Sequence, residues 1–238
     1  MYRVVSLLIG YVFGMFQTAY FVGRLNGIDI RDHGSKNAGF TNTNRVLGRK
    51  MGIIVFVADV LKAVLAFFIA NAIFWIFFAD GQSNSATIAI DMYNSLPGLY
   101  GGLGAVLGHV FPFYLKFKGG KGVSCALGVI LMLDWRVALI AFTLGAIAVA
   151  ITKYISVASM LITASVPFLL AVFWGVDRAN FPYALPFNGE TIRLTALLAV
   201  FVWWLHRANI SRLRKGQENK FSFKKTKNQK EKTTNDQP

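Results

Sequence analysis

The chain has 238 residues, of which 55% are hydrophobic and only 15% are charged, and its formal net charge is +14. A soluble domain carries about 25% charged residues, so this composition excludes an ordinary water-soluble fold and indicates a membrane protein. The basic residues lie in loops and near the carboxyl terminus rather than over a domain surface. This distribution disfavours nucleic acid as a partner.

Apolar runs predict the helices. In chain order they are residues 4–22, 52–79, 96–115, 123–133, 137–152, 155–175 and 191–205. A spanning helix needs about 20 apolar residues, and run 123–133 is too short to cross unaided. It is expected as a half-helix or as a helix that extends back through the preceding glycines. We therefore expect an all-α integral membrane protein, a bundle of about seven transmembrane helices, some short or broken, with five crossings as the alternative.

Lysine and arginine counts predict the orientation. The stretch 23–51 holds six, 116–122 holds three and the residues after 205 hold ten, whereas 80–95 holds none. Because basic loops stay in the cytoplasm, we expect the amino terminus outside the cell and the basic loops and carboxyl terminus on the cytoplasmic side of the membrane.

Residues 1–221 are expected to form a single transmembrane domain. Residues 222–238 are rich in Lys, Asn, Gln and Thr and are expected to form a disordered basic tail. The tail lysines could contact anionic membrane lipids, although a solvated tail without a specific role is the favoured reading.

The first polar cluster runs from Gly34 to Arg45. Gly34 and Gly39 permit backbone conformations closed to other residues, so backbone N–H groups can converge on an anion. Arg45 offers a planar guanidinium that matches phosphate oxygens, and a helix beginning near Thr41 would add its positive end. The side-chain donors are Ser35, Asn37, Thr41 and Asn42. We favour a phosphate site over a loop that only caps helices, because so many donors fall within twelve residues.

The second cluster is a glycine-rich loop with three lysines that leads directly into run 123–133. A glycine loop before a helix N-terminus is a recurring anion site, although the Walker A pattern is absent. The expected phosphate-binding residues are Lys116, Gly119, Gly120, Lys121 and Gly122, with His109 just upstream. A tight basic turn is the alternative, and the neighbouring first cluster favours binding.

The third cluster begins at His206, three residues before Asn209, so the two share a helix face. We expect both to face the site, and Arg207 and Arg212 to point elsewhere, toward lipid phosphate. For His206, a general base and a structural, hydrogen-bonded histidine remain equal alternatives.

Asp59 and Lys62 lie inside the second apolar run, where charges cost several kcal/mol unless they are paired. Their i, i+3 spacing allows an ion pair. A functional pair and a buried structural pair remain open.

Several kinds of chemistry are absent from the pattern. Three scattered histidines and one cysteine form no metal-ligand cluster, so no metal and no cofactor is expected. No histidine is followed by aspartate five positions on, which excludes the signature of thioester-dependent lipid acyltransferases. No GxSxG elbow is present.

The three clusters resemble the motifs of the bacterial acyl-phosphate:glycerol-3-phosphate acyltransferase family. Members carry GSxNxGxTNxxRxxG, GHxFPxxxKFKGGKG and HRxNIxRLxxGxE, which match this chain at residues 34–48, 108–122 and 206–218. The main departure is Lys36, which stands where glycine is usual and has less backbone freedom.

The resemblance implies a fatty acyl-phosphate donor, an sn-glycerol 3-phosphate acceptor and a lysophosphatidic acid product. Since the donor is a mixed anhydride, phosphate can leave as a stabilised anion without a covalent enzyme intermediate. The residues expected to be catalytic and to hold glycerol 3-phosphate are Ser35, Arg45, Lys121, His206 and Asn209. The groups expected to hold the acyl-phosphate are the backbone of Gly39–Asn42 with Asn37, Gly119 and Gly120. The proton acceptor is either a phosphate oxygen or His206.

A membrane transporter or binding protein for a phosphorylated solute is the alternative, because broken helices aimed at an anion are also a transporter device. That alternative predicts an internal repeat, yet the three motifs do not resemble one another. The sequence carries no signal for an oligomeric state.

Overall fold

The computed structural model describes residues 1–78, 96–180 and 189–221, and every regular element within these ranges is helical. The elements are α1 (Tyr2–Met15), α2 (Thr18–Leu25), η1 (Ile30–Asp32), α3 (Phe40–Leu47), α4 (Arg49–Phe78), α6 (Leu96–Val110), η2 (Phe113–Leu115), α7 (Val123–Leu133), α8 (Trp135–Thr152), α9 (Ile155–Asn180), α10 (Gly189–Leu205) and α11 (Arg207–Arg214). The predicted tail 222–238 and the predicted outer loop 80–95 lie outside the described residues.

Within the described residues each of the seven predicted apolar runs is mainly helical, although a break at Phe16–Gln17 divides run 4–22 into α1 and α2. Fewer than seven of the runs are full-length spans. Within the described residues, five segments are long and apolar enough to cross a membrane: Tyr2–Leu25, Arg49–Phe77, Leu96–Leu115, Trp135–Thr152 and Ile155–Gly175. The pair α10 and α11, bent by 55°, makes a sixth if it counts as one span. Helix α7 has 11 residues, about 16 Å, and reaches only halfway through the hydrocarbon core. The expectation of about seven spans is corrected accordingly.

The helix ends follow from local chemistry. Gly122 has φ 74° and starts α7 from the left-handed region, so the glycine loop is not part of the helix. Asp134 ends α7 and caps α8, accepting hydrogen bonds from the backbone N–H groups of Arg136 (2.7 Å) and Val137 (3.3 Å). Gly48, with φ 89°, separates α3 from α4. These turns put the amino-terminal ends of α3, α4 and α7 close to the polar clusters.

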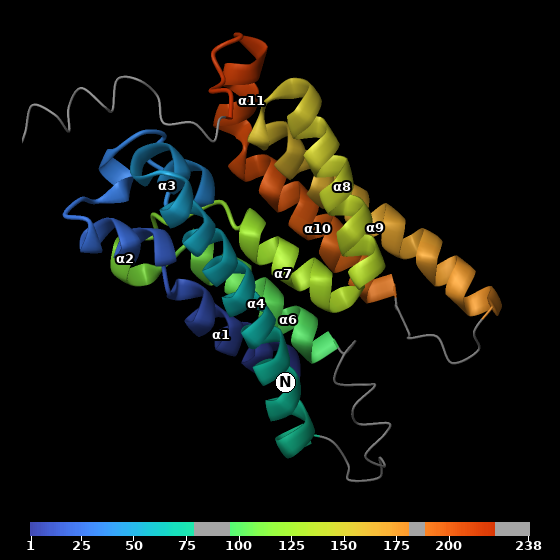
Figure 1. The fold of residues 1–238 in the computed structure, drawn as a ribbon. Helices are drawn as coiled ribbons and strands as arrows, with labels where there is room; N and C mark the ends of the chain where they lie inside the picture. The colour runs from blue at the N-terminus through green and yellow to red at the C-terminus, as the bar shows by residue number, and fades with distance from the viewer. Residues whose placement is uncertain (79–95, 181–188, 222–238) are drawn as a thin grey trace, which may run out of the picture.

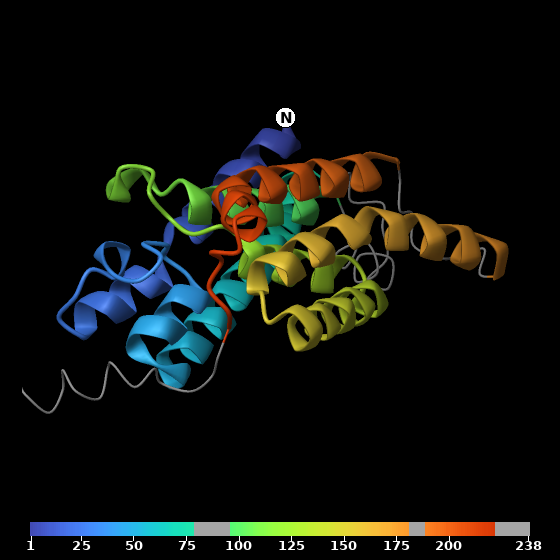
Figure 2. The ribbon, with the colours of Figure 1, turned by 90° about the horizontal axis from the view of Figure 1, so that it is seen from above.

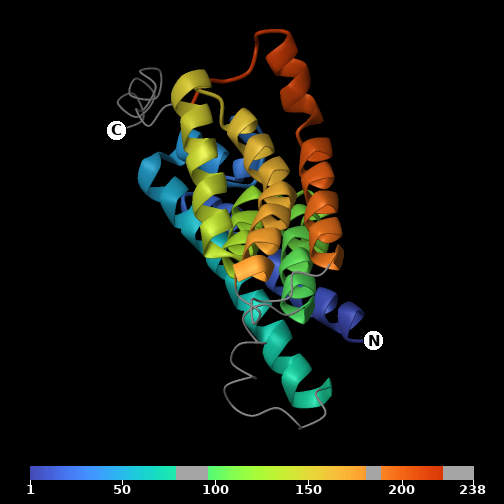
Figure 3. The ribbon, with the colours of Figure 1, turned by 90° about the vertical axis from the view of Figure 1, so that its right-hand side faces the viewer.

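The helices run roughly along one direction, and α2, α3 and α11 gather at the same end of the bundle (Figure 1, Figure 3). Seen from above, α11 and the segment after it lie between the α2–α3 region and the α8–α9 pair (Figure 2). Segments from the amino-terminal and carboxyl-terminal parts of the chain therefore meet at one end of the molecule.

Helices α1 and α6 pack at backbone contact. A Cβ atom on Gly10 would meet the Gly101 carbonyl, and one on Gly104 would meet the Leu7 carbonyl. In lipid, the hydrophobic effect does not drive helices together. Helices associate there through close van der Waals packing, which small residues allow because they let two backbones approach. This contact fixes α6, which carries His109 and leads to the second cluster.

Replacing Gly104 by alanine should therefore push α1 and α6 apart and destabilise the bundle by about 1–3 kcal/mol. The thermal unfolding midpoint of the detergent-solubilised protein measures this. The matched control is Gly175→Ala, because a Cβ at that helical glycine would meet nothing within 4 Å. Equal midpoints for the two variants would contradict the close packing.

Candidate active site

One cavity of about 710 Å³ joins residues from all three polar clusters. Its polar side chains include Ser35, Asn37, Arg45, Lys121, His206 and Asn209. Its apolar wall comes from α4, α7, α8 and α9 through residues such as Phe56, Leu127, Phe142, Val149 and Ile162. Backbone or side-chain atoms of Gly39, Thr41, His109 and Gly122 also line it. The cavity is thus polar on one side and apolar on the other.

Asn42 holds the first cluster in shape. Its side-chain oxygen accepts a hydrogen bond from the Ser35 N–H (2.7 Å), and its amide donates to the carbonyls of Ile30 (3.0 Å) and His33 (3.0 Å). The side chain is fully buried and does not line the cavity. Asn42 therefore positions Ser35, and the expectation that it binds substrate directly is not supported by its placement.

A carboxylate fixes the loop before this cluster. Asp29 accepts from the backbone N–H of Arg31 (3.0 Å) and from its guanidinium (2.7 Å), and these hydrogen bonds lower the pKa of Asp29 to about 2. Arg31 also donates to the Leu115 carbonyl at 3.3 Å. The loop is thereby tied to the segment that carries the second cluster.

The first cluster ends on the N-terminus of α3. Gly39 is the N-cap residue in an extended conformation, and α3 begins at Phe40, next to the predicted start at Thr41. Lys36 lies in the left-handed region with φ 59°, which costs a residue with a Cβ about 1 kcal/mol. Lys36 occupies the position where the family that this chain resembles usually has glycine. Its side chain adds a lysine to the lining of the cavity.

In the second cluster, Lys121 and Gly122 line the cavity, whereas Lys116, Gly119 and Gly120 do not. The N–H of Gly119 donates to the Val110 carbonyl (3.1 Å) and that of Gly120 to the His109 carbonyl (3.0 Å). Both N–H groups already donate to backbone carbonyls, so the prediction that they donate to phosphate is not supported. They shape the turn instead. Lys116 is exposed, with φ 56°.

The third cluster lies at the bend between α10 and α11. The His206 ring nitrogen Nδ1 is 2.8 Å from the Val202 carbonyl, and Asn209 accepts a short hydrogen bond from the Lys121 ammonium. His206 and Asn209 both line the cavity, as their expected common orientation requires. Arg212, in contrast, was predicted to point toward lipid, yet it lines the cavity and pairs with a carboxylate. The prediction for Arg212 was wrong, because Arg212 follows Asn209 by three residues on α11 and so shares its cavity-facing side.

Glu218 is that carboxylate. It accepts hydrogen bonds from Asn209 (2.6 Å), the Arg212 guanidinium (2.7 Å) and the Ser156 hydroxyl (3.1 Å). Burial would raise the pKa of Glu218, but these hydrogen bonds and the Arg212 charge hold it below its usual range. Glu218 therefore stays ionised among the cations of the site.

Burial also shifts the pKa values of Lys121 and His206, which both line the cavity. It lowers the pKa of Lys121 to about 8, an effect that the Arg212 charge increases and the Glu218 charge opposes. It lowers the pKa of His206 to about 4, and the Lys121 charge adds to this. At neutral pH, Lys121 is mostly a cation and His206 is neutral.

Sequence reasoning gave no role to Glu218, Ser156, Ser124 or Arg49, which all line the cavity. A signal existed for Glu218, since it is the last residue of the third motif and the only carboxylate between residues 206 and 218. The others carry no such pattern.

A buried group of possible metal ligands lies beside the cavity. Ligand atoms of Asp59, His109 and Cys125 fall within 4.8 Å of one another. However, the Lys62 ammonium lies 2.8 Å from Asp59 and 2.9 Å from His109. A protein cation already occupies the centre of this group, which disfavours a metal ion there.

Comparison with known proteins agrees with this geometry. A family model described as glycerol-3-phosphate acyltransferase matches residues 4–216. The chain belongs to the glycerol-3-phosphate acyltransferase family. A glycerol-3-phosphate acyltransferase of Fusobacterium nucleatum is 37% identical over 219 residues, 91% of this chain and 97% of that protein. One of Thermoanaerobacter sp. is 37% identical over 227 residues, 94% of this chain and 98% of that protein.

Solved structures of the family share the fold. The crystal structure of PlsY (YgiH), an integral membrane glycerol 3-phosphate acyltransferase, in its glycerol 3-phosphate form has a TM-score of 0.74 and 31% identity, covering 92% of this chain and 96% of that one. Its lysophosphatidic acid form has a TM-score of 0.72 and 30% identity, covering 93% and 96%. The chain is therefore an integral membrane protein of the same fold.

Replacing Glu218 by glutamine keeps its hydrogen-bond acceptor but removes its charge. Because the carboxylate raises the pKa of Lys121, the variant should become reactive at Lys121 at a pH about one unit lower. The pH dependence of Lys121 acetylation, followed by mass spectrometry, measures this. Glu190→Gln is the control, since Glu190 pairs with Arg3 instead (2.9 Å). An unchanged Lys121 midpoint in the Glu218 variant would refute the charge coupling.

Proposed function

We propose that this protein transfers a fatty acyl group from acyl-phosphate to sn-glycerol 3-phosphate and releases lysophosphatidic acid. The observation that carries the proposal is the cavity that joins a cationic side, built by three separate motifs, to an apolar wall from four helices. A phosphorylated acceptor fits the cationic side of the cavity, and an acyl chain fits the apolar wall. The transporter alternative does not require an apolar wall for a small solute.

The charge of the lining suits two phosphate groups at once. Its cations are Lys36, Arg45, Arg49, Lys121 and Arg212, and its carboxylates are Asp59 and Glu218. The charge of Asp59 is matched by Lys62, 2.8 Å away, so five cations face one remaining carboxylate. A phosphate monoester carries about −1.5 to −2 at neutral pH, so two of them approach the remaining positive charge. This balance supports an acyl-phosphate donor beside glycerol 3-phosphate.

Direct transfer fits the side chains at hand. The acceptor hydroxyl attacks the carbonyl carbon, the carbon–oxygen bond to phosphate breaks, and the hydroxyl proton passes to a phosphate oxygen to give hydrogen phosphate. His206 is a weak base because its pKa is about 4, and its Nδ1 is held by the Val202 carbonyl. Cys125 is buried in the main core rather than in the cavity. We therefore assign the proton to the substrate phosphate, and His206 and Asn209 to binding.

We also propose that the cavity faces the cytoplasm. The gathered end of the bundle carries the basic residues of all three clusters, and such charges are retained on the inner side of bacterial membranes. The amino terminus of α1 then lies at the outer face.

The donor is tested with purified protein, labelled glycerol 3-phosphate and one acyl donor at a time. Acyl-phosphate should give lysophosphatidate, while acyl-CoA and acyl-carrier protein should give none. Transfer from acyl-CoA alone would refute the donor assignment, and no product from any donor would refute the acyltransferase function.

Replacing Arg45 by alanine should lower kcat/KM by about 10²-fold or more, as expected when one positioned charge donor is removed. Steady-state kinetics with both substrates measures the loss. Arg207→Ala is the control, because Arg207 stacks on the Trp204 ring (4.4 Å) and does not line the cavity. Near-normal activity of the Arg45 variant would count against its place in the site.

A further inference from the structure

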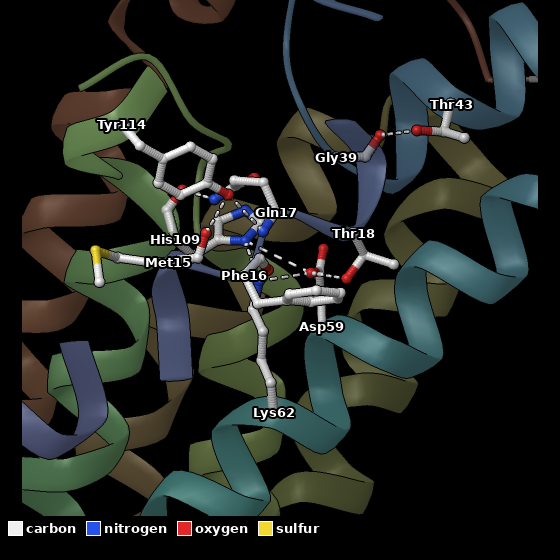
Figure 4. Close-up of polar contacts among 10 residues, drawn as sticks. All are labelled: Met15, Phe16, Gln17, Thr18, Gly39, Thr43, Asp59, Lys62, His109 and Tyr114. Atoms are coloured by element: carbon white, nitrogen blue, oxygen red, sulfur yellow. Dashed lines mark hydrogen bonds and ion pairs between the residues drawn. The ribbon is translucent and has the colours of Figure 1, made fainter. Parts of the chain in front are cut away.

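A buried polar cluster lies at the break between α1 and α2 (Figure 4), and two of its members, Asp59 and His109, also line the cavity. Its centre is Lys62 on α4. The Lys62 ammonium lies 2.8 Å from Asp59 Oδ1, 2.8 Å from the Phe16 carbonyl and 2.9 Å from His109 Nδ1. An ammonium has three donors and no acceptor, so each donor has one partner and the His109 nitrogen accepts.

This cluster closes the break in the first span. The Phe16 carbonyl is satisfied by Lys62, and the Met15 carbonyl accepts from the Tyr114 hydroxyl at 2.7 Å. Non-helical backbone at membrane depth is tolerated only where protein groups satisfy it. Lys62 thereby joins α4 to the break and, through His109, to the end of α6.

His109 connects this cluster to the turn formed by Gly119 and Gly120. Its carbonyl accepts from the Gln17 amide (2.5 Å) and from the Gly120 N–H (3.0 Å). Its imidazole lies so close to Gly120 that a Cβ there would not fit, and the Ala38 carbonyl lies on the same side. The next residue in the chain is Lys121, whose ammonium reaches Asn209.

We propose that Lys62 is a positioning residue for Lys121: it holds His109, and His109 sets the glycine turn from which Lys121 enters the cavity. Lys62 does not line the cavity and so does not touch substrate. A compact cation with three donors is required, because three different elements must be joined at one point. The proposal rests on the proposed function only for its kinetic consequence.

A purely structural ion pair would affect stability alone. Positioning also predicts a change around Lys121, which is faced by Arg212, Glu218 and His206. If the turn loosens, Lys121 becomes better hydrated, and its pKa should move from about 8 toward the ordinary value of 10.5. This readout needs no turnover.

The test compares Lys62→Met with the wild type in the purified full chain. The acetylation midpoint of Lys121 should rise by about one pH unit, and kcat/KM should fall about 10- to 100-fold, as for a misplaced binding group. Thr18→Val is the matched control, because it removes only the 3.3 Å hydrogen bond from Thr18 to Asp59 and should keep both values. A folded Lys62 variant with the wild-type midpoint would overturn the proposal.

If the Lys62 variant does not fold, the Lys121 midpoints of the His109→Asn and His109→Leu variants are compared instead. The two side chains have similar shape, but only asparagine offers an acceptor near the place of Nδ1. The asparagine variant should keep a Lys121 midpoint closer to the wild type, and equal midpoints would overturn the proposal. Absence of acyltransfer by the wild type would refute the proposed function and leave the labelling result unaffected.

Discussion

Mutual repulsion among cations is the constraint on which this site depends. Arg45, Lys121 and Arg212 converge from three distant segments, and the Glu218 carboxylate lies among them. By bonding Asn209 and Arg212 at once, Glu218 joins α11 to the segment that follows it. One carboxylate offsets part of the repulsion and leaves enough positive charge to attract phosphorylated substrates.

Close backbone approach makes this convergence possible. Glycines let α1 and α6 touch, and Gly119 and Gly120 fold the second cluster back onto the end of α6. In the first cluster, Asn42 plays the corresponding part by satisfying two loop carbonyls. Gly119, Gly120 and Asn42 therefore shape the site without lining it, whereas the cations, the hydroxyls and Asn209 line the cavity.

The polar group around Lys62 and the polar group around Glu218 have different roles. The cluster around Lys62 is buried inside the bundle, where the break in the first span would otherwise leave a backbone carbonyl unsatisfied. The cluster around Glu218 lies at the gathered end, where cations need a partner but must remain accessible. His109 contacts Lys62 through its ring and the Gly120 N–H through its carbonyl, so it connects the group around Lys62 to the glycine turn that precedes Lys121.

The sequence by itself predicted seven mainly helical apolar runs, the three motifs and a spacing that allows Asp59 to pair with Lys62, because apolar length and i, i+3 spacing are local properties. Tertiary structure alone decided which motif residues face the cavity. Gly119 and Gly120 looked like free donors until their N–H groups met the carbonyls of α6, and Arg212 was expected to face lipid until the fold placed Glu218 2.7 Å from it. Whether a donor is already satisfied depends on partners far along the chain, and a linear pattern does not contain that information.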